Sequence, residues 1–201
     1  MTQSEMIPFI EKIVLEQMQG ISLQVWILTA LAGIVAVHLF ILILTRMTDK
    51  KIGFMQEFLW CILIAYACFI FQITFYNREP GSRNGVNIAV SMGSIRGGYG
   101  NAQRLVYSFL NIVLFLPWGF LLSWINRKRR YGIILFMTTL YCFLTSSMIE
   151  ISQHLTRRGY LEVTDLITNT LGGVLGSIMA CLLLIVYRRI RHKSDISQRS
   201  N

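Results

Sequence analysis

The chain has 201 residues, of which 54% are apolar and 14% are charged, and its mean hydropathy is +0.53. Soluble proteins carry about 25% charged residues, so this composition excludes an ordinary soluble enzyme. The net charge of +9 does not indicate nucleic acid as a partner. The basic residues lie beside long apolar runs, where they set membrane topology and meet lipid headgroups.

Five apolar runs are long enough to cross a bilayer, which takes roughly 20 residues because the hydrocarbon core is about 30 Å thick. None of them contains Asp, Glu, Lys or Arg. In chain order they are Gln24 to Leu44, Phe58 to Tyr76, Leu105 to Ile125, Tyr131 to Ile149 and Leu166 to Tyr187. The sequence therefore predicts an all-α fold, a polytopic membrane helix bundle with about five transmembrane helices. The cysteines lie inside these runs and are interpreted as packing residues, so no disulfide and no cofactor is predicted.

The residues before the first run carry an apolar stripe at helical spacing, from Ile7 to Ile21. Glu5, Glu11 and Glu16 make this segment acidic, unlike the basic start of a cleaved signal peptide. We expect a helix here, either at the membrane interface or as a plain lead-in to the first span.

Lysine and arginine residues predict the orientation of the bundle. They gather between the third and fourth runs, at residues 127–130, and after the fifth run, at residues 188–199. Cytoplasmic segments are enriched in these residues, so both segments are predicted to be cytoplasmic. The N-terminus is then outside and the C-terminus inside. The glycine-rich segment 77–104 becomes an external loop, either flexible or folded back.

Polar side chains from three segments are predicted to meet near the outer ends of the spans. They come from the outer part of the third span, the end of the fourth span with the loop that follows it, and the start of the fifth span. Polar groups are costly in a membrane, so their positions indicate a role. The candidate polar site consists of Asn111, Glu150, Gln153, Arg158, Glu162, Asp165 and Asn169.

This cluster has three interpretations. As a ligand site, it would bind a substrate or a lipid headgroup, or perform acid–base chemistry. As a metal site, two carboxylates and His154 would hold a divalent cation. As a structural feature, Asp165 would favour the start of its helix, the asparagines would bond between helices, and Glu150 would pair with Arg158. We assign no catalytic nucleophile and no metal ligand.

Two features of the third and fifth spans are predicted to shape helix packing. Gly172 and Gly176 are four residues apart, a spacing that allows two helices to approach closely. Pro117 lies inside the third span, where it removes a backbone donor and favours a kink.

The second half of the chain resembles the VanZ-like family of small bacterial membrane proteins. The resemblance extends from about Asn87 to Ser177 and rests on three stretches, NIVLFLPWG, Arg158–Gly159 and TDLITNTLGGVLG. Residues that match the family's motifs are Asn111, Phe115, Pro117, Gly119, Glu150, Gln153, Arg158, Asp165, Asn169, Gly172, Gly173 and Gly176. Gly119 and Gly173 thereby join the predicted packing residues. Glu162 stands where the family usually has Asp, which keeps the charge.

The resemblance implies a multi-pass protein of the bacterial plasma membrane, with an N-terminal part (1–86), a VanZ-like domain (87–187) and a basic cytoplasmic tail (188–201). It also implies resistance or tolerance to glycopeptide antibiotics, teicoplanin above all, or to other envelope-directed antimicrobials. The expected partners are membrane lipids and a lipid-linked wall precursor or lipoglycopeptide, and the sequence specifies no oligomeric state. Two alternatives stay open: an intramembrane enzyme that modifies a lipid headgroup or lipid-linked precursor, and a scaffold for another envelope protein.

Overall fold

A computed structural model describes the chain except for residues 1–2, 20, 49–52, 77, 82–84, 95–97 and 200–201. The described part contains six α-helices, one π-helical turn (η1) and two short strands. In order they are α1 Gln3–Gln19, α2 Leu23–Thr48, α3 Phe54–Phe71, η1 Gln72–Tyr76, β1 Val86–Asn87, α4 Tyr99–Ile125, α5 Tyr131–Leu155, β2 Leu161–Glu162 and α6 Val163–Arg199.

Five of the helices are long and apolar enough to cross a membrane: α2, α3 together with η1, α4, α5, and α6 as far as Arg191. The predicted all-α class and its five spans are therefore confirmed. The helices extend past the apolar runs, because a helix continues into polar residues as long as its backbone bonds can be made. The 27 residues of α4 correspond to about 40 Å at 1.5 Å per residue.

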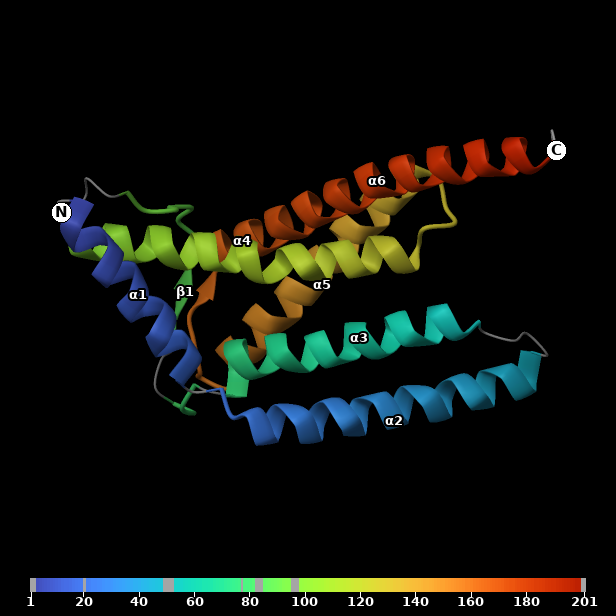
Figure 1. The fold of residues 1–201 in the computed structure, drawn as a ribbon. Coiled ribbons are helices and arrows are strands. Elements are labelled where there is room, and N and C mark those ends of the chain that lie inside the picture. Colours follow the sequence, from blue (N-terminus) through green and yellow to red (C-terminus); the bar gives the residue numbers. More distant parts are fainter. Residues whose placement is uncertain are drawn as a thin grey trace.

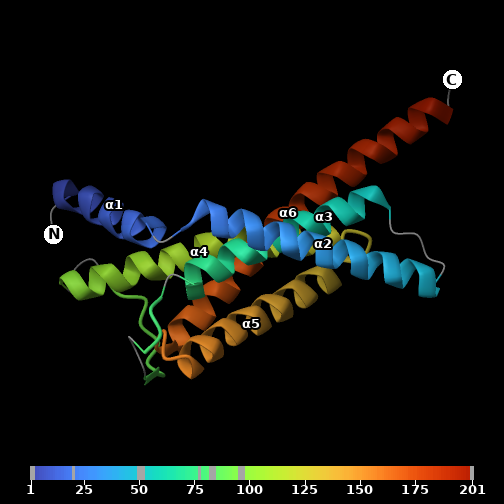
Figure 2. The ribbon, with the colours of Figure 1, turned by 90° about the horizontal axis from the view of Figure 1, so that it is seen from below.

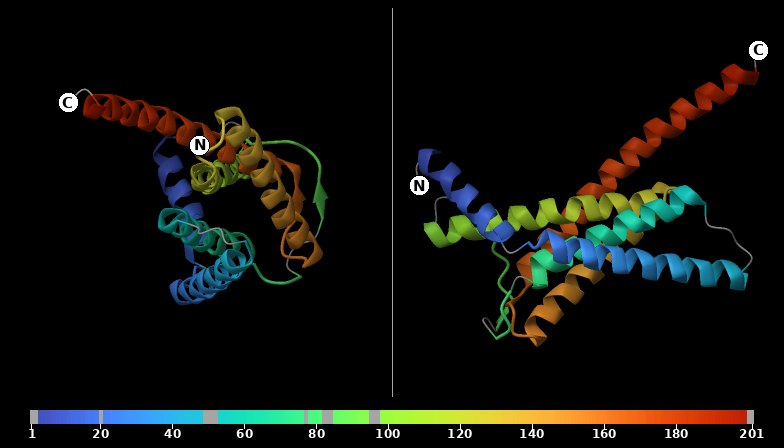
Figure 3. Two further views of the ribbon diagram at one scale, coloured as in Figure 1. Left: turned by 90° about the vertical axis from the view of Figure 1, so that its right-hand side faces the viewer. Right: turned by 60° about the horizontal axis from the view of Figure 1, so that its bottom comes forward.

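The helices form two groups (Figures 1 and 3). One group is the antiparallel pair α2 and α3, and the other consists of α4, α5 and α6. At one end of the bundle, which we call the loop end, α4 and α6 begin, α5 finishes, and the segment between η1 and α4 folds over them. The opposite end, the basic end, carries residues 127–130 and the C-terminal part of α6.

Helix α6 packs along α4 with the two backbones in contact, and glycine makes this possible. A Cβ atom on Gly119 would lie 2.0 Å from the carbonyl oxygen of Gly173, and one on Gly176 would lie 2.0 Å from that of Leu116. A Cβ on Gly172 would meet the Ile112 oxygen at 2.3 Å. No side chain fits at such distances, so these glycines set the spacing of the two helices.

The remaining packing residues surround this contact. A Cβ on Gly173 would meet the Cys142 sulfur of α5 at 2.2 Å, so this glycine admits α5 to the same interface. Pro117 lies inside α4, which continues to Ile125. Phe115 beside it is fully buried, in a core cluster with Trp118 and Leu63 of α3.

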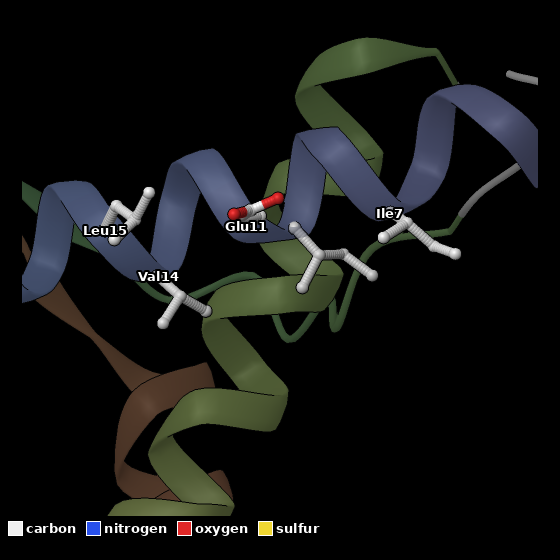
Figure 4. Close-up of a pocket in the computed structure, with 5 residues that line it drawn as sticks. Ile7, Glu11, Val14 and Leu15 are labelled. Carbon is white, nitrogen blue, oxygen red and sulfur yellow. The ribbon is translucent and has the colours of Figure 1, made fainter.

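Helix α1 is a separate helix that packs across the first half of α4 (Figure 2). Phe9 and Ile13 are buried against Ala102, and the rings of Phe9 and Tyr99 meet edge to face at 4.5 Å. Its other face leaves Ile7 and Leu15 exposed and forms a shallow apolar hollow around Glu11 (Figure 4). This hollow contains none of the polar residues predicted to form a site.

Candidate functional site

The loop end of the bundle is covered by the segment between η1 and α4. Strand β1 pairs with β2 in parallel, with Val86 opposite Leu161 and Asn87 opposite Glu162. Thr164, in the first turn of α6, accepts a hydrogen bond from the Ser91 amide at 3.1 Å and donates one to the Ala89 carbonyl at 3.3 Å. The described part of the predicted external loop is thus folded back onto α6.

Three carboxylates lie beneath this covering segment. Glu150, near the end of α5, is only 4% exposed, and its Oε2 accepts the backbone amide of Glu162 at 2.9 Å. Asp165 lies in the first turn of α6, where the helix dipole favours a negative charge. All three groups interact electrostatically with one another. The structure therefore brings Glu150, Glu162 and Asp165 together.

Arg78 supplies positive charge from the covering segment. Its guanidinium interacts electrostatically with both Glu150 and Asp165. It lies against Gly159, where an added Cβ would be 2.8 Å from its Nη1 atom and 3.2 Å from Oε1 of Gln153. Gly159 is consequently the residue that gives this guanidinium room to reach the carboxylates.

Two asparagines connect the carboxylates to the helices around them. Asn111 of α4 hydrogen-bonds the Asp165 carboxylate and lies 3.5 Å from the Thr168 hydroxyl. Asn169, one turn below Asp165 on α6, donates from Nδ2 to the Ser146 hydroxyl of α5 at 2.9 Å. Its Oδ1 atom is buried and has no hydrogen-bond partner among the described residues.

The other two predicted site residues, Gln153 and Arg158, turn toward η1. Gln153 donates to the Thr74 carbonyl at 2.6 Å, and Arg158 donates to the Phe75 carbonyl at 3.0 Å with its guanidinium over the Phe75 ring. The last carbonyls of a helix lack partners within it, so these side chains satisfy them. Gln153 and Arg158 thus attach α3 to the end of α5, and Glu150 bonds to Glu162 instead of to Arg158.

The described groups of the cluster are polar groups that can bind a polar or charged ligand. Within the described residues, no group of three or more His, Cys, Asp and Glu side chains is arranged to hold a metal ion. The Asn111 amide bonds Asp165, the Glu162 backbone N–H bonds Glu150, and the Arg78 guanidinium interacts electrostatically with both carboxylates. Such groups are hydrogen-bond donors for anions. Ser146 is fully buried and accepts a bond from Asn169, so it is held as a structural partner and not as an activated nucleophile.

The family model described as VanZ/LLP1 matches residues 58–185, well over half of the chain. The chain belongs to this family. The match includes α3 and η1, to which Gln153 and Arg158 bind, as well as Arg78 and all of α4 and α5. No curated protein and no solved structure matches the chain.

Sequence reasoning missed Arg78, which belongs to the site as much as the carboxylates do. Its signal was its position, because it is the first charged residue after the second span and follows it by two residues. It was overlooked because nothing periodic in a glycine-rich loop shows that the loop folds back. Thr164 and Thr168 were also missed, since threonine in a membrane helix commonly bonds to its own backbone, as Thr168 does to Thr164 at 3.0 Å.

Proposed function

We propose that this VanZ/LLP1-family protein contributes to tolerance of envelope-directed antimicrobials, with teicoplanin-type glycopeptides first among them. It does so through the loop-end cluster of Glu150, Glu162, Asp165 and Arg78. On the predicted orientation, this cluster lies in the outer leaflet, where such drugs meet lipid-linked wall precursors. Family membership supports the envelope role.

The observation that carries the proposal is the burial of charge beneath a folded-back loop. Burying a carboxylate costs several kcal/mol unless it is paired, and a bundle held together only by packing has no need of three. Glu150 is 4% exposed and Asp165 belongs to the same cluster. Such groups are retained in membrane proteins mainly where they bind or move something.

Binding is the mode of action that the side chains favour. The donors and acceptors of the cluster are suited to recognise a polar headgroup or the peptide part of a wall precursor. Occupying that group at the outer leaflet would change the access of a drug to its target. Covalent catalysis would require a nucleophile beside a base, whereas the Ser146 hydroxyl is enclosed and bonded to Asn169, and the Thr168 hydroxyl bonds to the backbone of its own helix.

The test is antibiotic susceptibility in cells that lack the protein and are complemented with wild type, Glu150→Gln or Asp165→Asn. Both substitutions keep the shape of the side chain and remove its charge. We expect wild type to raise the inhibitory concentration of teicoplanin and both variants to lose that effect at equal membrane level. The matched control is Ser123→Ala. It removes a buried hydroxyl of α4 that contacts Thr138 of α5 and Ser177 of α6 near the basic end, and it is expected to protect like wild type.

Two results would contradict the proposal. Protection by Glu150→Gln and Asp165→Asn equal to that of wild type would show that the cluster is structural. Absence of any protection by wild type, against teicoplanin and against cationic peptides alike, would show that the family role does not extend to this chain. Comparison of lipid extracts from the same strains tests the enzymatic alternative, which predicts a changed headgroup or precursor.

A further inference from the structure

The loop-end cluster contains more negative charge than its own cation balances. Glu150, Glu162 and Asp165 interact with one another, and among the described residues the cation that interacts with Glu150 and Asp165 is Arg78. Arg158 is turned away, with its guanidinium on the ring and carbonyl of Phe75. Among the described residues, three carboxyl groups therefore lie around one guanidinium, and a buried carboxylate is stable only when it is paired.

A second observation, independent of charge, points in the same direction. Asn169 is 4% exposed, and its Oδ1 atom is buried without a hydrogen-bond partner among the described residues. Its Nδ2 atom is already used by the Ser146 hydroxyl. Asn169 follows Asp165 by one helical turn on the same face of α6, and its partner Ser146 precedes Glu150 by one turn on α5. Within the part of the chain that the structure describes, the cluster thus has an unpartnered acceptor as well as more carboxyl groups than cations.

We propose that the loop-end site binds a protonated primary amine, an inference that rests on the proposed function of the same cluster. An ammonium group supplies one positive charge and three N–H donors, which would pair with the carboxyl groups and with the Asn169 acceptor. It is also a compact point charge. A divalent metal ion fits less well, because no set of ligands converges among the described residues.

At the outer leaflet, a primary amine has two sources: the headgroup of an aminophospholipid, and a soluble amine. Both present the same ammonium to the carboxylates. They differ in attachment, since a lipid would also place its acyl chains along the exposed apolar faces of α5, where Met148 is 70% exposed and Ile151 is 50% exposed. The experiment has to separate these two sources.

The experiment is native mass spectrometry of the full-length protein in detergent micelles, with phosphatidylethanolamine, phosphatidylcholine and phosphatidylglycerol of identical acyl chains. Phosphatidylcholine is the sharpest comparison, because it carries a positive charge but no N–H donor. We expect wild type to retain phosphatidylethanolamine over phosphatidylcholine by about tenfold, the effect of one or two hydrogen bonds to charged groups. If millimolar ethanolamine displaces the lipid, the site recognises the amine alone. If it does not, the site recognises the amine on a lipid.

Variants with opposite expected signs separate binding from folding. Glu162→Gln removes the charge of a partly buried carboxylate and leaves its backbone bond to Glu150, so the preference for phosphatidylethanolamine should fall severalfold. Arg78→Gln removes the competing cation, so the preference should rise, which a merely damaged fold would not produce. Ser123→Ala should retain the wild-type preference.

Equal retention of the three lipids by wild type, or an unchanged preference in Glu162→Gln, would overturn the amine site. The proposed function fails separately. If Glu150→Gln abolishes drug tolerance while no amine preference is found, the function stands and its ligand is of another class. If the amine preference is found in a protein that gives no tolerance, the inference stands and the function does not.

Discussion

Two polar clusters join the same three helices, and they differ in charge, in burial and in whether all their hydrogen-bonding atoms have partners. Toward the basic end, the hydroxyls of Ser123, Thr138 and Ser177 come from α4, α5 and α6. Ser123 lies 3.0 Å from Thr138 and donates to Ser177 at 2.8 Å, and all three residues are fully buried. At the loop end the same helices contribute Asn111, Glu150 and Asp165.

The hydroxyl cluster is neutral and internally satisfied, as expected of polar groups that hold helices together in lipid. The loop-end cluster is charged, contains an unsatisfied acceptor at Asn169, and is covered by a loop. The two clusters share their helices but differ in burial, because the three hydroxyl residues are fully buried whereas Asn111 and Asp165 are only partly buried. A bundle that can satisfy three hydroxyls in one place has no structural reason to leave charge and an acceptor unbalanced in another.

The largest expected effect comes from breaking both clusters at once. Gly176→Ala would place a Cβ 2.0 Å from the Leu116 carbonyl oxygen and force α4 and α6 apart. We expect a loss of about 3 kcal/mol or more in stability and loss of the folded protein from the membrane. Gly132→Ala is the matched control, since nothing lies within 4 Å of its Cβ position. Fluorescence-detected size exclusion after a heating series measures both, and equal melting temperatures would disprove the backbone contact.

The hydroxyl cluster alone is tested by Ser123→Ala. Ser123 is the central member, so its loss leaves Thr138 and Ser177 without their shared partner at full burial. The expected cost is about 1–2 kcal/mol, visible as a lower melting temperature, with drug tolerance and lipid preference unchanged. If Ser123→Ala lost tolerance while staying folded, the two clusters would be coupled, and the hydroxyl cluster would not be a purely structural one.

Glu150→Gln is expected to have the opposite effects: stability is kept or increased, and drug tolerance is lost. The amide oxygen of the new side chain keeps the bond from the Glu162 amide, while the buried one of three mutually repelling carboxylates loses its charge. Neutralising a buried charge of this kind is often stabilising, so we expect a gain of about 1 kcal/mol together with the loss of function. The same heating series detects the gain. A marked decrease in melting temperature would mean that the charge of Glu150 supports the fold.

The sequence predicted the five spans and those residues of the loop-end cluster that lie on helices. Both follow from local patterns in the sequence, namely the length of apolar runs and helical spacing. Apolar length identifies a span, and spacing of three or four residues puts Glu150 and Gln153 on one face. Spacing could not show that Gln153 and Arg158 bind the carbonyls of η1, since those partners lie 79 and 83 residues away. Nor could it place Arg78, whose position depends on tertiary pairing between β1 and β2. The partners of side chains at the ends of helices therefore depend on how the connecting segments fold, which local spacing does not show.

The smallest expected effect isolates that loop. Thr164→Val keeps the shape of a side chain that accepts from the Ser91 amide and donates to the Ala89 carbonyl, and it removes both bonds. Global stability should fall by no more than about 1 kcal/mol, because the core packing of α6 is untouched. Amide hydrogen exchange at residues 86–94 should nevertheless become faster, since local opening then costs less. Thr170→Val is the control, as Thr170 bonds to Leu166 within its own helix. Unchanged exchange in Thr164→Val would mean that β1 and β2 alone hold the loop over the carboxylates, and that access to the site is controlled by the strand pair rather than by α6.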